Sequence, residues 1–169
     1  MKFAILFAAL TIGLLFIIRA FAERFGNTVR VRFFESKTDY SPDRLRKFVK
    51  RQREEALRYA FPILFPLDLL FLLCLGGFIY MGSVSLLEAS RVAQSLVQLA
   101  VILPAIYVIC DLIEDVLLAS CFISARPDRI SESLIRIIQQ VTLIKIWSAR
   151  LGLVQVALIA LWSIAYVGS

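Results

Sequence analysis

Three carboxylates lie within one long apolar stretch of the sequence, at residues 107–121. Asp111 is followed by Glu114 after three residues and by Asp115 after four, so on an α-helix all three side chains project from one face. An ionised side chain that faces lipid in the middle of a bilayer costs about 2.5 kcal/mol or more. We therefore expect this face to look into a helical bundle or a water-filled cavity. Carboxylates in such a place can carry protons, bind cations or hold helices together.

Charged side chains also interrupt two other apolar stretches, as Asp68 in one and as Lys145 and Arg150 in the other. Counting about 1.5 Å per residue from the cytoplasmic end of each stretch, which is the C-terminal end of the third stretch, places Asp68, Asp115 and Lys145 at a similar depth. We expect the two carboxylates to surround Lys145, because they would satisfy the donors of a dehydrated ammonium. Arg150 lies about 140° around the helix from Lys145 and should face another neighbour or extend toward the interface. The predicted buried polar network, or possible ion or ligand site, is Asp68, Asp111, Glu114, Asp115, Lys145 and Arg150.

The predicted network is not balanced in charge, because it contains four acids and two bases. A negative excess in a low-dielectric layer is relieved by protonation, by bound cations or by water in a cavity. If the layer is fully paired, its role is structural, and it clasps the helices of an accessory or interaction protein. If ions reach it, the chain is a proton- or cation-coupled small transporter or a channel subunit. We favour the structural interpretation.

A small membrane enzyme is the third interpretation, with carboxylates as acid and base or as ligands of a hard metal ion. The sequence contains no histidine, the commonest general base and transition-metal ligand. It also lacks a Gly-rich phosphate loop, a G-x-S-x-G nucleophile elbow and an H-E-x-x-H helix. We therefore assign no catalytic residue, no cofactor and no metal site. Whether the chain is an enzyme stays open, with the balance against it.

The composition is that of a membrane protein. The 169 residues are 60% hydrophobic, with a mean hydropathy of +0.81. Soluble domains contain roughly 45–50% apolar residues, so we expect one membrane domain and no separate soluble domain. The net charge of +6 is concentrated, because residues 19–58 hold twelve Lys or Arg against six Asp or Glu. A basic loop beside hydrophobic spans follows the positive-inside rule, so we expect no nucleic-acid partner.

Four apolar stretches are long enough to cross a bilayer as helices. We expect them at residues 3–22, 60–81, 94–124 and 134–167, within a single transmembrane domain that comprises residues 1–169. The predicted fold class is therefore an all-α membrane protein, a bundle of four transmembrane helices. Pro62 and Pro66 should kink the start of the second helix, because proline lacks the backbone N–H that a helix requires.

The basic segment at residues 23–58 contains two further elements. Residues 29–34 alternate apolar and basic side chains, which predicts a short strand or an extended interfacial segment. Ser41 and Pro42 supply a helix N-cap and a first-turn proline, so an amphipathic helix should begin there. We expect this helix, at residues 41–58, to lie on the cytoplasmic membrane surface with its apolar side inward and to lead into the second span. Its basic side either contacts anionic lipids or a partner, or serves only to fix the topology.

Both basic loops, at residues 23–58 and 126–129, belong in the cytoplasm by the positive-inside rule. The N- and C-termini should then face outward, in a multi-pass protein of a bacterial inner membrane or its equivalent. We expect the lipid bilayer as partner, with a homo-oligomer or a larger membrane complex left open. The first stretch also resembles a signal peptide, because Ala20 and Ala22 fit a cleavage pattern. Its basic flank follows the apolar run, so we expect the helix to be retained.

Small residues mark where helices are expected to approach closely. Ala9 and Gly13 form one small-x-x-x-small pair, and Ser148 and Gly152 form another on the face that carries Lys145. The cysteines are odd in number and show no C-x-x-C spacing, so we expect free thiols packed as small apolar side chains. These are Cys74, Cys110 and Cys121.

Three short motifs occur in order along the last two thirds of the chain. They are Phe65-Pro-Leu-Asp68, then Leu103-Pro104 followed by Asp111-Leu-Ile-Glu114-Asp115, and finally Leu143-Ile-Lys145-Ile-Trp147. In these motifs the chain resembles a group of small, uncharacterised bacterial membrane proteins with four helices. Such proteins often carry Asn at the position of Asp115, so the acid here is a departure. The resemblance implies a four-helix fold with a polar cluster, and it implies no activity.

Overall fold

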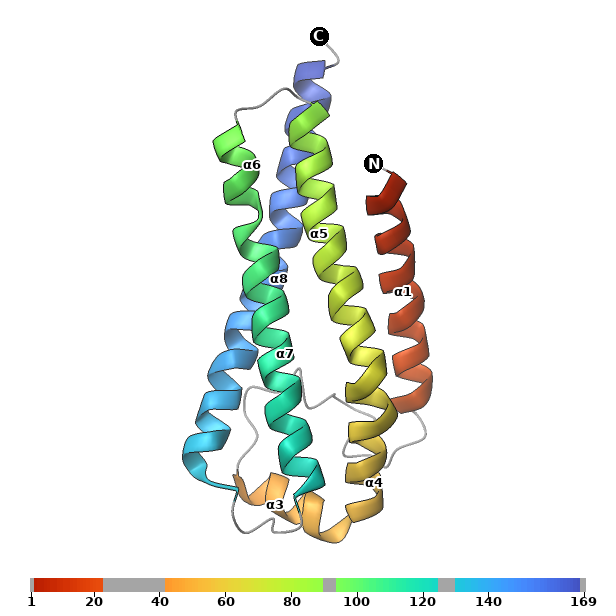
Figure 1. Cartoon of the computed structure of the whole chain (residues 1–169), viewed down its shortest axis with the longest axis vertical. Coiled ribbons are helices and arrows are strands. Elements are labelled where there is room, and N and C mark those ends of the chain that lie inside the picture. Colours follow the sequence, from red (N-terminus) through yellow and green to blue (C-terminus); the bar gives the residue numbers. More distant parts are fainter. Residues whose placement is uncertain (1, 23–41, 90–93, 125–129, 168–169) are drawn as a thin grey trace.

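The structure is a computed structural model that describes residues 2–22, 42–89, 94–124 and 130–167 (Figure 1). Within these ranges every regular element is helical. The elements are α1 (Lys2–Ala22), α3 (Pro42–Arg51), α4 (Arg53–Arg58), η2 (Tyr59–Asp68), α5 (Leu69–Ala89), α6 (Gln94–Ala100), α7 (Ile102–Ile123) and α8 (Glu132–Val167). Four spans of the described residues are long and apolar enough to cross a membrane, at Lys2–Phe21, Arg53–Glu88, Leu96–Ile123 and Glu132–Ala165. The predicted all-helical fold is confirmed, and the possible strand at residues 29–34 lies outside the described residues.

Helices α5, α7 and α8 form the centre of the bundle, since each of the three packs against the other two. Helix α1 runs along the outside of α5 and also contacts η2 (Figure 1). The N-terminal end of α1 and the C-terminal end of α8 lie at one end of the bundle, and α3 and α4 lie across the opposite end. Large apolar side chains on the outer faces are exposed, among them Phe16, Leu158 and Ile164. The bundle therefore presents an apolar outer surface.

The start of the second span is irregular, as its two prolines predicted. Phe61 and Phe65 precede Pro62 and Pro66 and have extended backbone angles (φ −135°, ψ 118° and φ −126°, ψ 118°). A residue before proline is sterically disfavoured in the helical region, and proline donates no backbone hydrogen bond. Regular helix therefore resumes only with α5, directly after Asp68. Helix α5 then continues beyond the predicted end of this span, residue 81.

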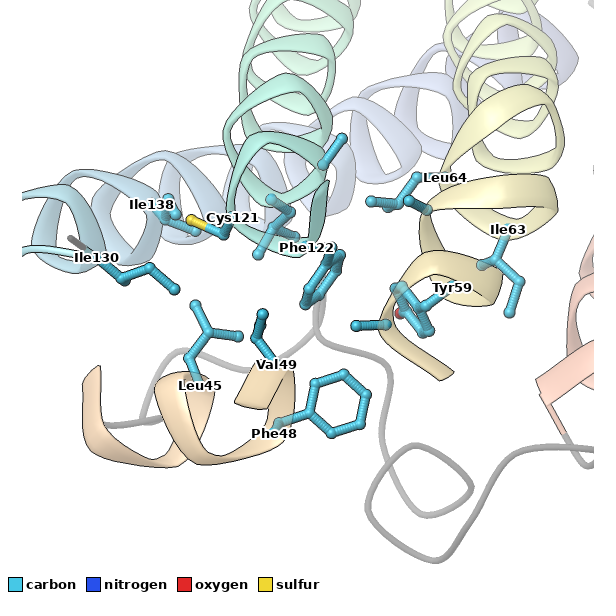
Figure 2. Close-up of a cluster of buried hydrophobic side chains, with 14 of the residues drawn as sticks. Leu45, Phe48, Val49, Tyr59, Ile63, Leu64, Cys121, Phe122, Ile130 and Ile138 are labelled. Carbon is cyan, nitrogen blue, oxygen red and sulfur yellow. The ribbon is translucent and has the colours of Figure 1, made fainter. Parts of the chain in front are cut away.

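Helix α3 covers the end of the bundle, and its apolar side is buried by protein (Figure 2). Leu45, Phe48 and Val49 belong to a cluster with residues from the ends of α7 and α8. The ring of Phe48 lies edge-on to that of Phe122, with 6.0 Å between centroids. The helix breaks at Gln52 (φ −126°, ψ 50°) before α4 begins. The prediction of one continuous helix at residues 41–58 is therefore wrong, and its apolar side, which does face inward, is covered by protein.

Two arginines fasten this segment to the connection between α7 and α8. Arg53 donates hydrogen bonds to three successive carbonyl oxygens at residues 122–124, where α7 ends, including one of 2.9 Å from Nη2 to Ile123. Arg46 donates to the carbonyl oxygen of Ile130, from Nε at 2.9 Å and from Nη2 at 2.5 Å. The guanidinium of Arg53 suits the end of α7, because its planar donors and positive charge complement the unpaired carbonyls of a helix C-terminus.

The third span consists of two helices, α6 and α7, although the sequence predicted one helix at residues 94–124. Pro104 accounts for the break, because it has no N–H to donate to the carbonyl oxygen of Ala100 four residues earlier. Gln155 of α8 donates to that oxygen instead, at 3.0 Å. The same amide nitrogen donates to Oγ of buried Ser83 on α5, at 2.8 Å. One side chain thus joins three helices at the point where the backbone ladder is interrupted.

Glycines allow α5 to approach both of its central neighbours. A Cβ at Gly152 would lie 2.9 Å from Cγ2 of Ile79, and a Cβ at Gly76 would lie 2.5 Å from Cγ2 of Val108. The close approach predicted at Gly152 is confirmed. At Gly13 the prediction is wrong, because among the described residues no atom of another helix lies within 4 Å of where a Cβ would stand.

Candidate functional site

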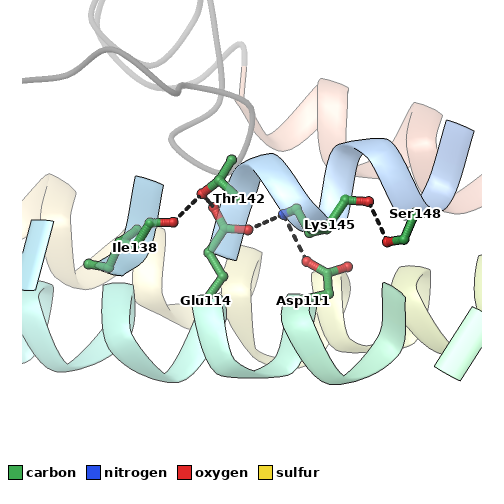
Figure 3. Close-up of polar contacts among 6 residues, drawn as sticks. All are labelled: Asp111, Glu114, Ile138, Thr142, Lys145 and Ser148. Atoms are coloured by element: carbon green, nitrogen blue, oxygen red, sulfur yellow. Dashed lines mark hydrogen bonds and ion pairs between the residues drawn. The ribbon is translucent and has the colours of Figure 1, made fainter. Parts of the chain in front are cut away.

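Lys145 forms a buried ion-pair network with two acids of α7 (Figure 3). Its Nζ lies 2.8 Å from Oδ1 of Asp111 and also contacts Oε2 of Glu114. Asp111 is 2% exposed, Glu114 0% and Lys145 7%, so the three charges are removed from the outer surface. The two acids are three residues apart and therefore share the face of α7 that packs against α8. The sequence-based expectation that this acidic face looks inward is confirmed.

The second oxygen of Glu114 is bound by the same helix that carries the lysine. Thr142 precedes Lys145 by three residues, and its Oγ1 lies 2.5 Å from Oε1 of Glu114. The same hydroxyl lies 2.8 Å from the carbonyl oxygen of Ile138, and its one proton is donated to one of these acceptors at a time (Figure 3). On the other side of Lys145, Ser148 donates to the lysine carbonyl at 2.9 Å. Both carboxylate oxygens of Glu114 are therefore engaged by α8.

Asp111 and Glu114 form ion pairs with Lys145 that the residue count did not single out. Counting residues placed Asp68 and Asp115 around the lysine, and in the structure Asp68 lines the same cavity as the lysine. Counting gives the depth of a side chain along its helix but not the direction in which that helix turns it. The rotation of α7 against α8 is set by packing, and it brings the other two acids to the lysine.

A group of three carboxylates adjoins this network. Ligand oxygens of Asp68, Asp111 and Asp115 all lie within 4.8 Å of one another. Asp115 is fully buried, and Asp68, at the end of η2, is half-buried. Carboxylate oxygens are the ligands preferred by hard cations such as Mg²⁺ and Ca²⁺, so these three residues could hold one.

A cavity of about 250 Å³ lies beside the network, partly open and bounded by α1 on one side and α8 on another. Its polar wall consists of Asp68, Tyr107, Asp111 and Lys145. The remaining wall is apolar and is formed by Leu15, Ile18, Ile63, Phe71, Leu75, Ile146 and Ala149. The cavity thus combines an apolar body with one charged end.

Arg150 does not belong to the buried network, contrary to its place in the predicted site. Its side chain is exposed, and its guanidinium carbon lies 5.7 Å from the centroid of the Trp147 ring, a cation–π contact. The rotation of about 140° that separates it from Lys145 turns it to the outer face of α8. The six predicted site residues therefore divide into five acids and bases that the structure brings together and one that it does not.

Sequence reasoning missed several residues that the site depends on. Thr142 shares a helical face with Lys145 and Ser148, at steps of three residues, and this spacing is a signal that could have found it. Tyr107 precedes Asp111 by four residues, so its position on the acidic face was also readable. The contact of Gln155 with Ala100 joins residues far apart in the sequence, and no local pattern indicates it.

The three cysteines are free thiols, as expected, with Cys74 and Cys121 buried and Cys110 half-buried. Comparison with known proteins assigns no relative to this arrangement. No protein-family model matches the chain, and no curated protein and no solved structure matches it.

Proposed function

We propose that the chain is a multi-pass integral membrane protein with both termini outside and with α3 and α4 at the cytoplasmic end. The proposal is supported by the four apolar spans and by the position of the N-terminal end of α1 and the C-terminal end of α8, opposite α3 and α4. Lys47, Lys50 and Arg51 are exposed on α3. In the proposed orientation they lie next to the negatively charged inner leaflet, where anionic headgroups would bind them.

Labelling of introduced cysteines tests this orientation. In a background without the three native cysteines, Lys47→Cys reports on the end that carries α3, and Glu88→Cys reports on the opposite end. Both positions are exposed. A membrane-impermeant maleimide added to intact cells should label Glu88→Cys at once and Lys47→Cys only after lysis. The reverse order of labelling would overturn the proposed orientation.

We propose that the protein is a structural or accessory membrane component, and that the buried charge layer clasps its helices rather than performing turnover. The observation that carries this proposal is the engagement of Lys145 by Asp111 and Glu114 across the contact between α7 and α8. Thr142 of α8 donates to the second oxygen of Glu114 across the same contact. A network in which partners are supplied by facing helices fixes one packing arrangement, because any slip leaves a charge unpaired in low dielectric.

A second function, proton- or cation-coupled transport, is favoured by the three carboxylates whose oxygens lie within 4.8 Å of one another. Flux measurements on the purified protein in liposomes separate the two functions. If the layer is a clasp, imposed gradients of H⁺, Na⁺ or K⁺ produce no flux above that of empty liposomes. A pH-dependent flux that is lost in Asp111→Asn protein with an unchanged unfolding profile would replace the clasp by transport.

A further inference from the structure

The cavity between α1 and α8 is chemically divided. Leu15 and Ile18 of α1 and Ile146 of α8 give it apolar walls, whereas Asp68 and Asp111 place two carboxylates at one end. Such a cavity favours a ligand with an apolar body and one charged group. The apolar body then contacts the apolar wall, and the charged group contacts the charged residues.

The charge at the polar end favours a cation over an anion. Two carboxylates and one ammonium line this end, and that ammonium also forms an ion pair with Glu114, which lies outside the cavity lining. Asp115 adds a carboxylate whose oxygen lies within 4.8 Å of those of Asp68 and Asp111. An incoming cation reduces a negative excess here, whereas an incoming anion increases it.

Aromatic rings occupy the same lining as the carboxylates. Phe71 of α5 and Tyr107 of α7 both border the cavity. Aromatic faces attract cations through the ring quadrupole, and the attraction grows where water is excluded. Carboxylates with aromatic rings are the combination that recognises quaternary ammonium groups, because these cations are large, weakly hydrated and unable to donate hydrogen bonds.

We propose that this cavity is a binding site for a small monocation of the ammonium type with an apolar body, which reaches it from the bilayer between α1 and α8. Its volume of about 250 Å³ sets the size of the ligand. A cavity of ~150 Å³ holds one benzene molecule, so this site accommodates one aromatic ring with a short alkylated ammonium group. The site goes beyond the proposed clasp, which requires no ligand.

Three probes of nearly one shape test the proposal: benzyltrimethylammonium, its neutral carbon analogue neopentylbenzene, and the anion phenylmethanesulfonate. Each is titrated calorimetrically into the full chain in phosphatidylcholine nanodiscs, with protein-free nanodiscs as the blank. The cation should bind saturably at one site per chain, and the neutral and anionic probes should bind at least tenfold more weakly. Equal binding of cation and neutral analogue, or preferential binding of the anion, would overturn the proposal.

Variants locate the binding. Asp68→Asn removes a half-buried lining carboxylate at almost constant volume and should weaken binding of the cation at least tenfold. Glu88→Gln, which removes an exposed acid of α5 that is not part of the lining, is the matched control and should leave binding unchanged. If Asp68→Asn protein does not fold, binding of the cation to Ala149→Leu protein is measured instead. This substitution fills the cavity and keeps every charge, so it should also weaken binding. Unchanged binding in folded Asp68→Asn protein or in Ala149→Leu protein would refute the site.

These results are independent of the clasp. The clasp is judged by unfolding of the protein without ligand, and the cavity by binding to the folded protein. A stable, fully coupled network with no cation binding refutes the cavity proposal alone. Saturable cation binding to a bundle whose stability does not depend on Lys145 refutes the clasp alone.

Discussion

Lys145 takes part in both features of this bundle, the contact between α7 and α8 and the polar end of the cavity. Its depth in the layer was predictable from the sequence, because the helical rise per residue is constant. The inward direction of Asp111 and Glu114 was also predictable, since their spacing matches the helical period. The pairing of Asp111 and Glu114 with Lys145 was not predictable. It depends on the rotation of α7 against α8, which many distant contacts determine together.

Replacing Lys145 by Met should lower the free energy of unfolding by about 3–5 kcal/mol, because it leaves two buried acids without their cation. Adding Glu114→Gln should recover part of that loss. Unfolding of the purified protein in detergent, followed by circular dichroism, gives the coupling energy of the two residues by a double-mutant cycle.

The matched control uses Asp43→Asn with Lys145→Met. Asp43 is an exposed acid that pairs with Arg46 on α3, and its coupling to Lys145 should be indistinguishable from zero. If Glu114 shows as little coupling to Lys145 as Asp43 does, the ion pair does not stabilise the bundle.

Gln155 offers a second measurement at the scale of single residues. Gln155→Leu should destabilise the protein by about 1–3 kcal/mol, because it leaves the carbonyl oxygen of Ala100 without its donor. In a Pro104→Ala background the same change should cost less, since residue 104 then has an N–H to donate to that oxygen. Thermal melts of the four proteins provide the comparison, and an equal cost in both backgrounds would contradict this account of the break.

At the scale of elements, the positions of the helices followed from the apolar stretches, and the irregular start of the second span followed from its prolines. The sequence pattern did not predict the break between α3 and α4, and it did not predict that protein buries the apolar side of α3. An amphipathic pattern states that one face avoids water, but it does not state whether lipid or protein covers that face. Here the ends of α7 and α8 supply the cover.

Arg53 should be more sensitive to substitution than the other basic residues near it. Arg53→Lys should lose most of the stabilisation, because a single ammonium cannot reproduce a planar set of donors to three carbonyl oxygens. Lys50→Arg and Lys50→Gln, at an exposed position of α3, are the controls and should be neutral. Limited proteolysis at the end of the bundle that carries α3 measures this loss of stability. Equal resistance of Arg53→Lys and wild-type protein would be evidence that the hydrogen bonds of Arg53 to the end of α7 do not stabilise it.

The packing of α5 gives a matched pair of glycine substitutions. Gly152→Ala should destabilise the bundle, by about 1–3 kcal/mol for an overpacked contact, because the new methyl group would lie 2.9 Å from Ile79. Gly13→Ala should be neutral or stabilising, since its methyl group meets open space and alanine favours the helix. Melting temperatures of both variants test this, and a larger loss at Gly13 would show that α1 is packed differently.

For the whole molecule, the number of spans could be predicted from the sequence, and the cavity could not. Its walls come from α1, η2, α5, α7 and α8, so it exists only when segments far apart in the chain are in place. Apolar residues such as Leu15 and Ile146 read in the sequence as lipid-facing or core positions. No local pattern distinguishes those from a cavity wall.

A chain cut before Glu132 should be unstable in cells, because α7 then keeps its acids while Lys145 is missing. Replacing Asp111 and Asp115 by Asn and Glu114 by Gln should lengthen the lifetime of this truncated chain, since it removes the charges. Pulse-chase measurement compares the two truncated proteins, and the same triple substitution in the full chain should not lengthen its lifetime. Equal lifetimes of both truncated chains would mean that the unpaired acids of α7 do not cause the degradation of the truncated chain.

The two sides of the ion-pair network between α7 and α8 are synthesised in a fixed order. Synthesis proceeds from the N-terminus, so the acids of α7 leave the ribosome before Lys145 does. Lys145 follows Glu114 by 31 residues, which at about 5–20 residues per second is an interval of roughly 2–6 s. In the proposed membrane protein, α7 carries acids during that interval that lipid does not tolerate, so it must stay near water or near the insertion machinery. The arrival of α8 ends this requirement in the proposed membrane protein, because Lys145 then pairs with the acids of α7.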